Sequence, residues 1–361
     1  MANIQANKPK PSPSIIKSNL KNAGFILDDY ISKTLNKNSK VVSDWIDALL
    51  QQNIDYKASI DPSQIQAQTI QKETSKPQHS SNIVEATHQT ASSQVNSASI
   101  QEQSKPENAK LQKIYEKCAK QTDTGNYEKA LENYNKLLEI AKEADDKNIE
   151  TKVYMDLAFI HDVNNDLPAA LENYYNAAML AGQTGDNGTK AKAHYNMATI
   201  YDDLGKIDTA MIHYYCSLSY DGEAENLNGQ TLSLNNIGNM YTVQYDYKTG
   251  LDYYKLAYSL TKELDDKTGQ AAILNNIAGI FRDLGYDEKS LKYYRDAIKL
   301  DLKAGNVEGY AKSYDLAGDI MLKNGQYDKA ENLYTKSLLA AQEVGDKAWQ
   351  ARMNEKLQMT G

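Results

Sequence analysis

A tyrosine recurs every 40 residues through the C-terminal two thirds of the chain, at positions 134, 174, 214, 254, 294 and 334. Tyrosine fills 26 of the 361 positions, so five further matches at one fixed spacing would arise by chance about twice in a million. A period of this length is typical of arrays in which one supersecondary unit is stacked many times. The period therefore restricts the fold more than any other feature.

Three further columns keep the same period and show what the unit is. One column is small (Cys118, Ala158, Ala198, Gly238, Ala278, Gly318), as is a second (Ala130, Ala170, Ala210, Gly250, Ser290, Ala330), and a third marks a turn (Gly125, Asn165, Gly205, Tyr245, Gly285, Gly325). In the fifth unit, apolar residues at helical spacing lie on both sides of Gly285. Each unit is therefore predicted to be a helical hairpin in which small residues let neighbouring helices approach closely and the tyrosine fills the gap between hairpins.

The small, small, aromatic and small positions, as in Ala198, Ala210, Tyr214 and Ser217, resemble the tetratricopeptide repeat family. The usual unit of that family has about 34 residues, whereas this one has 40 and resembles the subgroup of kinesin light chains and peptide-sensing bacterial regulators. The resemblance implies an all-α fold, a right-handed α-solenoid of about six hairpins over 107–361. A closing helix is expected over Gln350–Met359.

The first 106 residues follow a different pattern. Residues 1–13 are expected to be disordered, and apolar residues at helical spacing predict a helical hairpin over 14–56. The stripe of Trp45, Ile46, Leu49 and Leu50 exceeds what one partner helix can cover, so this hairpin is expected to dock elsewhere or to self-associate. Residues 57–106 carry no aromatic side chain after Lys57 and are rich in Ser, Gln and Thr, which predicts a disordered linker.

Composition and charge exclude several classes of function. Residues 107–361 hold 29 basic and 39 acidic side chains, and such an acidic region repels phosphate backbones, so nucleic acid is not an expected partner. No stretch is long and apolar enough for a membrane span, and no secretory signal is visible, so the expected location is the cytoplasm. With two cysteines, no zinc spacing, no phosphate loop and no nucleophile motif, we expect neither a metal, a cofactor nor an enzyme. The histidines at 161, 194 and 213 fall in three different columns and do not predict a cluster.

The resemblance implies that ligands bind in a concave groove formed by the first helix of each hairpin. The groove positions carried over are Lys192, Tyr195, Asn196, Asp202, Asp203, Asn235, Asn236, Asn239, Asn275, Asn276, Arg282, Asp283, Asp315 and Asp319. Asparagine is disfavoured inside helices, yet Asn196, Asn236 and Asn276 share one column. We favour binding of an extended peptide backbone by these amides. The alternative is that they bridge neighbouring helices.

These observations predict an adaptor that holds a neutral or mildly basic peptide or protein in the groove. In this interpretation, the 14–56 hairpin engages a second partner on its linker. The alternative is a ligand-switched regulator, a peptide sensor in which groove binding controls the N-terminal hairpin. The sequence does not identify the partner.

Overall fold

The structure, a computed structural model, describes residues 106–361, and residues 1–105 lie outside the described part of the chain. The expected disordered start, the hairpin over 14–56 and the linker up to residue 105 therefore stay predictions. Pro106, the last residue of the expected linker, is the first residue of a helix. Within the described residues all regular structure is helical, in the following order: α6 (Pro106–Asp123), α7 (Tyr127–Glu143), α8 (Lys147–Val163), α9 (Leu167–Thr184), α10 (Asn187–Asp203), α11 (Ile207–Glu223), α12 (Leu227–Val243), α13 (Tyr247–Glu263), α14 (Lys267–Asp283), α15 (Asp287–Ala304), α16 (Val307–Lys323), α17 (Tyr327–Glu343) and α18 (Lys347–Gln358).

The helix boundaries follow from short polar signals. Asp or Asn precedes each of the helices α8, α10, α12, α14, α16 and α18, and its side chain accepts a hydrogen bond from the backbone N–H three residues later. The predicted turn column joins the two helices of each hairpin, and all six of its residues have positive φ. Four of them are glycine, which adopts this conformation without a steric penalty. The six predicted hairpins, α6–α7 to α16–α17, and the closing helix α18 are thus confirmed.

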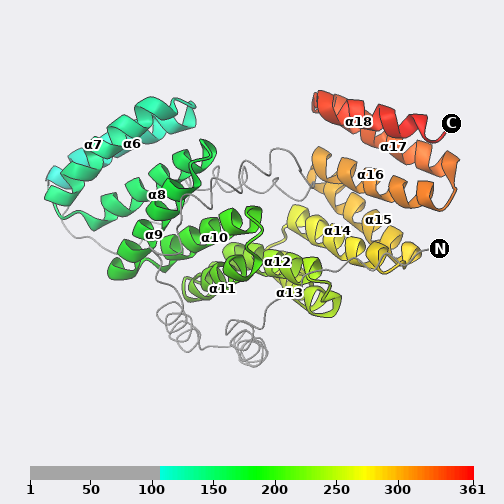
Figure 1. Cartoon of the computed structure of the whole chain (residues 1–361), viewed down its shortest axis with the longest axis horizontal. Coiled ribbons are helices and arrows are strands. Elements are labelled where there is room, and N and C mark those ends of the chain that lie inside the picture. The colour runs from blue at the N-terminus through cyan, green and yellow to red at the C-terminus, as the bar shows by residue number, and fades with distance from the viewer. Residues whose placement is uncertain (1–105) are drawn as a thin grey trace, which may run out of the picture. The chain divides into compact units, whose positions relative to one another are not determined.

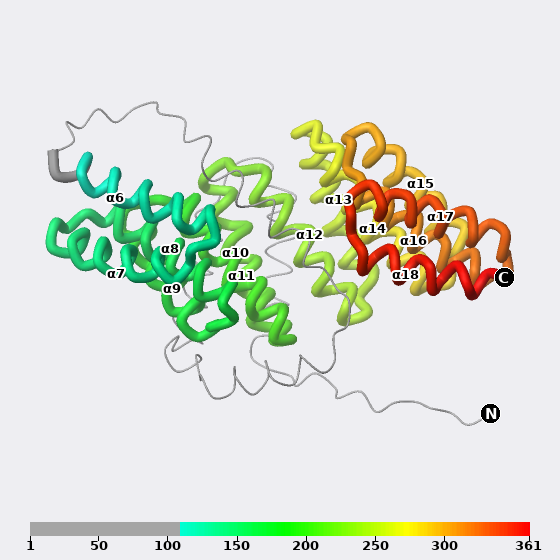
Figure 2. The backbone as a smooth tube through the Cα atoms, turned by 90° about the horizontal axis from the view of Figure 1, so that it is seen from above, coloured from blue at the N-terminus to red at the C-terminus, as the bar shows by residue number. Residues whose placement is uncertain are grey.

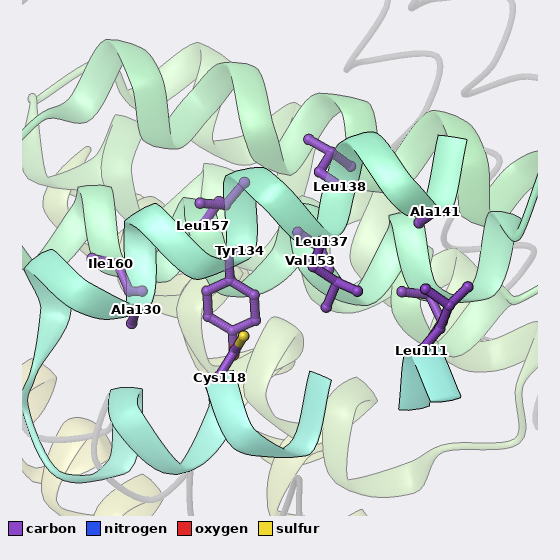
Figure 3. Packing of buried hydrophobic residues seen from close by; sticks show 11 residues of the cluster. Leu111, Cys118, Ala130, Tyr134, Leu137, Leu138, Ala141, Val153, Leu157 and Ile160 are labelled. Carbon is purple, nitrogen blue, oxygen red and sulfur yellow. The ribbon is translucent and has the colours of Figure 1, made fainter. Parts of the chain in front are cut away.

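The tyrosine column forms the core between the helices. All six tyrosines are at most 2% exposed, and Figure 3 shows the Tyr134 ring from α7 pointing at Cys118 of α6. The tyrosine limits the residue opposite it, and at Gly238 there is no room even for a Cβ, since one added there would lie 2.7 Å from Cε1 of Tyr254. The small residues thus let the helices approach closely, as predicted, whereas the Tyr254 ring, expected between hairpins, lies against Gly238 between the two helices of one hairpin.

Successive hairpins lie side by side from α6 to α18 (Figure 2). In Figure 1 the repeat array forms an arc in which α8, α10, α12 and α14 lie on the inner side and α9, α11 and α13 on the outer side. The first helices α8, α10, α12 and α14 therefore line the inner side of the arc. We call this surface, formed by the first helices α6 to α16 and by α18, the inner face.

Candidate binding surface on the first helices

All fourteen predicted site residues lie on four consecutive first helices, α10, α12, α14 and α16. Asn235 and Asp315 are buried, Asp203 and Asp283 are exposed, and the other ten are half-buried. The structure thus gathers the predicted residues on the inner face and makes most of them only partly accessible. The hydrogen bonds that these side chains already make within the protein determine which of their polar groups could bind a ligand.

The asparagines connect neighbouring repeats in a fixed register. The side-chain amide of Asn236 on α12 donates to the Tyr195 hydroxyl on α10 over 3.0 Å, and Asn276 on α14 donates to Oδ1 of Asn235 over 2.8 Å. In both cases the acceptor lies 41 residues earlier, on the preceding first helix. We call this set of hydrogen bonds the inter-repeat ladder. Bridging, the alternative role for these asparagines, is therefore present in the structure.

In α16, where the column of Asn236 and Asn276 does not hold asparagine, a serine hydroxyl supplies the inter-repeat hydrogen bond. Leu316 occupies the column in α16, and the Ser313 hydroxyl bonds to Oδ1 of Asn275 instead, over 2.8 Å. Asn239 accepts a hydrogen bond of 2.6 Å from Tyr254 and donates to Oδ1 of Asn236 over 3.3 Å. The ladder therefore links α10 to α16 without an ion pair between these side chains.

The hydrogen bonds of the ladder do not use all the polar groups of the asparagine side chains. An asparagine side chain offers two N–H donors and a carbonyl oxygen with two lone pairs, and Asn276 uses one N–H. Among the described residues, its second N–H and its carbonyl oxygen have no partner. Because Asn276 is half-buried, these groups remain available to a ligand on the inner face.

The N-terminal part of the inner face is acidic. Asp156 accepts a 2.8 Å hydrogen bond from Tyr134, and burial raises its pKa, with the charge of Lys192 acting in the opposite direction. Burial, helped by the charge of Asp203, raises the pKa of Asp162 to about 6. Burial also lowers the pKa of Lys192, against the effect of Asp156. Groups on helix surfaces are desolvated in this way when protein surrounds them on several sides.

At the C-terminal end, α18 adds residues that the sequence analysis missed. Lys356 contacts Asp315 and Asp319, each over 2.6 Å, and Arg352 contacts Asp315 over 3.3 Å. Lys356 is 41 residues after Asp315, the same register as in the ladder. Extending the 40-residue columns by one more period would have placed Lys356 with Asn236 and Asn276. Arg282, by contrast, pairs with its neighbour Asp283.

Two histidines whose columns gave no reason to pair them lie together within repeat 3. Nδ1 of His194 on α10 is 3.0 Å from Nδ1 of His213 on α11, and both side chains are buried. Within residues 106–361 no group of three or more His, Cys, Asp or Glu side chains could hold a metal ion. None of the helices in the described range is long and apolar enough to cross a membrane.

Models of three tetratricopeptide-repeat families match residues 230–303, 313–348, and 121–143 with 191–222. The chain is a tetratricopeptide-repeat protein. The matches cover parts of all the predicted repeats except the second, whose α8–α9 hairpin nevertheless has the same fold. A comparison with curated protein sequences finds no significant match.

Three solved structures of similar fold are a phosphatase, a quorum sensor and a Rap protein. Aspartyl phosphate phosphatase F from Bacillus subtilis matches with a TM-score of 0.56 and 17% identity, over 70% of this chain and 69% of its own. The quorum sensor NprR from B. thuringiensis, in its apo form, gives 0.51 and 17% over 85% and 80%. A Rap protein complexed with Competence and Sporulation Factor gives 0.51 and 15% over 68% and 80%. At these identities the likeness supports the repeat fold.

Proposed function

We propose that the protein is a binding scaffold that holds an extended peptide, or a peptide segment of a partner protein, along the inner face. The observation that carries this proposal is the row of half-buried amides on α12 and α14, which keep unused donors and acceptors while the ladder fixes their positions. An extended peptide backbone presents alternating N–H and C=O groups, which asparagine side chains match without requiring a particular sequence. Peptide binding gives these amides a use beyond the ladder, at helix-interior positions where asparagine has a lower helix propensity than alanine.

Charge restricts the ligand. The acidic side chains at 156, 162, 202 and 203 lie on α8 and α10, where the charge of Lys192 acts on Asp156. Complementary charge favours a neutral or mildly basic ligand over this part of the inner face. Nucleic acid is an unsuitable partner for the same reason.

Gly279 offers a direct test because the space beside it is open. It lies on α14 in the inner-face column that holds Phe159, Thr199 and Asn239 in other repeats, and no atom lies within 4 Å of a Cβ added there. Gly279→Phe should place a ring on the inner face without disturbing the core. Gly279→Ala is the control for the helix itself, and Ser259→Phe, on an exposed position of α13, is the control for an added ring.

The experiment presents immobilised full-length protein to a displayed library of random twelve-residue peptides. Affinities of the enriched peptides are then measured by fluorescence polarisation. We expect Gly279→Phe to weaken binding at least about tenfold, since several hydrogen bonds would be lost, while both controls bind like the parent. If the enriched peptides bind Gly279→Phe and the parent equally well, the inner face is not the binding surface.

A second candidate function is a ligand-switched regulator. It is supported by the fold shared with a protein named as a quorum sensor and with a Rap protein solved with a bound factor. In this case the ligand must bind two arrangements of the chain with different affinities. Small-angle scattering of the full chain with a saturating library peptide separates the two candidates: an adaptor keeps its radius of gyration, and a switched regulator changes it.

A further inference from the structure

One of the six core tyrosines lacks the hydrogen bond that its counterpart in the preceding repeat makes. Tyr254 donates its hydroxyl proton to Asn239 over 2.6 Å, and Asn239 lies 15 residues earlier, on the first helix of the same repeat. The residue 15 positions before Tyr294 is Gly279, which has no side chain. Among the described residues, no group accepts a hydrogen bond from the buried hydroxyl of Tyr294.

The alternative partner used by other repeats is missing as well. Tyr334 bonds to Asp319, 15 residues earlier, over 2.8 Å. In the first three repeats the partner lies 22 residues after the tyrosine, on the next first helix, in the pairs Tyr134–Asp156, Tyr174–Asn196 and Tyr214–Asn236. The residue 22 positions after Tyr294 is Leu316. Both positions that hold a polar partner elsewhere are therefore apolar around Tyr294.

The space of the missing side chain is open. No atom lies within 4 Å of a Cβ added to Gly279, and this glycine is half-buried, as is Asn239 in the same column. The Tyr294 side chain lies deeper and is 1% exposed. A buried donor without an acceptor destabilises the fold. A group brought in from outside can therefore make a hydrogen bond that the chain itself does not supply.

The charges near this space are already paired. Arg282, one turn after Gly279, contacts Asp283 over 3.0 Å, and Asp319 contacts Lys356 over 2.6 Å. An ionised carboxylate entering the space would therefore lose water without gaining a free cation, which is unfavourable. An uncharged carbonyl oxygen meets no such penalty. In repeat 4 the carboxamide of Asn239 occupies the equivalent place and accepts the tyrosine proton.

We propose that Gly279 and the Tyr294 hydroxyl form a carboxamide-binding subsite, which takes the side chain of an asparagine or glutamine of the bound peptide. This inference rests on the proposed function. Because the hydroxyl is buried, the group that reaches it must project from the peptide, as a side chain does. Asn276 lies one turn before Gly279 on the same face of α14, and its unused carbonyl oxygen can accept from the NH₂ group of the ligand. The carboxamide is thus bound at both ends.

The binding test uses the twelve-residue library and the polarisation assay described above. Peptides enriched on the parent are remade with alanine, aspartate or glutamate in place of each asparagine or glutamine, and with the two amides exchanged. Three protein variants are compared. Tyr294→Phe removes the donor, Gly279→Asn fills the space with an internal carboxamide, and Tyr254→Phe is the matched control, because the Tyr254 hydroxyl is already bonded to Asn239.

We expect the enriched peptides to share an asparagine or glutamine, and its replacement by alanine or by the acid to weaken binding to the parent about tenfold. The amide with the lower Kd identifies the side-chain length. In Tyr294→Phe and Gly279→Asn the difference between amide and alanine peptides should shrink to about threefold or less, and in Tyr254→Phe it should persist. Enriched peptides without a shared amide, or the same alanine effect in the parent and Tyr294→Phe, would overturn the subsite.

Melts of the unliganded protein test the unsatisfied hydroxyl itself. Tyr254→Phe should lower the melting temperature because it breaks a hydrogen bond, whereas Tyr294→Phe should leave it unchanged or higher. Gly279→Asn should raise it more in the parent than in the Tyr294→Phe background, where there is no proton to accept. An equal fall in Tyr294→Phe and Tyr254→Phe would mean that water already accepts the Tyr294 proton, and it would count against the subsite.

The two proposals give different patterns when they fail. Peptides that lose binding in Gly279→Phe but bind Gly279→Asn and Tyr294→Phe like the parent retain the scaffold and remove the subsite. Peptides that ignore both Gly279→Phe and Gly279→Asn remove the inner face as the binding surface, and the subsite with it.

Discussion

His194 and His213 share a single hydrogen bond between their Nδ1 atoms, 3.0 Å apart, inside the hairpin formed by α10 and α11. One ring must donate through N–H and the other accept, so the pair holds one proton between these two atoms. Tyr201 stacks on His213 and Tyr220 on His194, and burial lowers the pKa of both histidines to about 3. Lys190, over the Tyr220 ring, lowers the pKa of His194 further.

The first prediction is that this pair makes the protein sensitive to acid. Histidine in an unfolded chain has a pKa near 6.5. Below that pH the unfolded chain therefore binds more protons than the folded chain, in which the pair stays neutral. The stabilisation is complete above about pH 6.5 and is lost as the pH falls towards 3. We expect urea unfolding at pH 7.5, 6, 5 and 4 to show a steeper loss of stability for the parent than for His194→Leu/His213→Leu.

Leucine is a matched replacement at one of these positions, since Leu234 and Leu274 occupy the column of His194. The parent and the double variant contain the same carboxylates. The difference between their unfolding free energies at each pH therefore excludes the contribution of carboxylate titration. Parallel stability curves for the parent and the double variant would show that the pair does not resist protonation.

The second prediction concerns Asp221, whose titration changes stability with pH in the direction opposite to that of the histidine pair. It accepts hydrogen bonds from Asn226 over 2.7 Å and from Ser217 over 3.3 Å, yet burial raises its pKa to about 7. Because this lies above the unfolded value near 3.9, the folded chain binds the extra proton, and stability falls as the pH rises from about 4 through 7. Asp221→Asn should raise the melting temperature at pH 8 and change it much less at pH 5. An equal shift at both pH values would contradict the raised pKa.

The third prediction is that the inter-repeat ladder carries stability as well as binding groups. Asn276→Ala removes the donor from the buried Asn235 carbonyl, which costs about 1–3 kcal/mol, while alanine returns about 0.5 kcal/mol of helix propensity. We expect a net loss near 1 kcal/mol by urea unfolding. In Asn235→Ala/Asn276→Ala no buried carbonyl is left unsatisfied, so the double loss should be smaller than the sum of the single losses. Strictly additive losses would mean that the 2.8 Å hydrogen bond does not couple α12 to α14.

The fourth prediction contrasts two glycines. Gly279→Ala should stabilise the protein by up to about 1 kcal/mol, because it lies inside α14 with open space around it. Gly229→Ala should destabilise it by about 1–3 kcal/mol, since a Cβ there would overlap the buried Asp221 carboxyl. Thermal melts compare the two variants. The opposite order would show that the Asp221 carboxyl moves aside readily.

The repeat architecture could be predicted from the sequence because its cause is visible in the sequence. Each repeat needs a large buried side chain, small residues beside it and a turn, and each of these needs appears in the sequence as a column. In the structure the six tyrosines from Tyr134 to Tyr334 are buried rings. The inner-face residues on α10 to α16 were predicted by carrying positions over from the family. Their placement on one surface follows from the period alone.

The partners of those residues could not be predicted. Whether Asn276 reaches Asn235 or a ligand depends on how closely α14 approaches α12, which packing of the second helices sets. The histidine pair could not be predicted from the columns, because His194 and His213 lie on facing helices of one hairpin, 19 residues apart.

The contact between α16 and α18 uses a different kind of interaction from the contacts between the earlier first helices. Between α10 and α16 the ladder uses amides and hydroxyls, whose strength does not depend on dissolved ions, whereas α18 is held to α16 at this register by Lys356. Mobile ions at physiological ionic strength screen exposed charges over about 8 Å. The Asp319 arm of the Lys356 contact is partly open to solvent and is therefore subject to that screening. The polar contact between α16 and α18 at this register therefore depends on salt, in contrast to the amide and hydroxyl contacts between α10 and α16, while Met353 packs α18 against Tyr334 in either case.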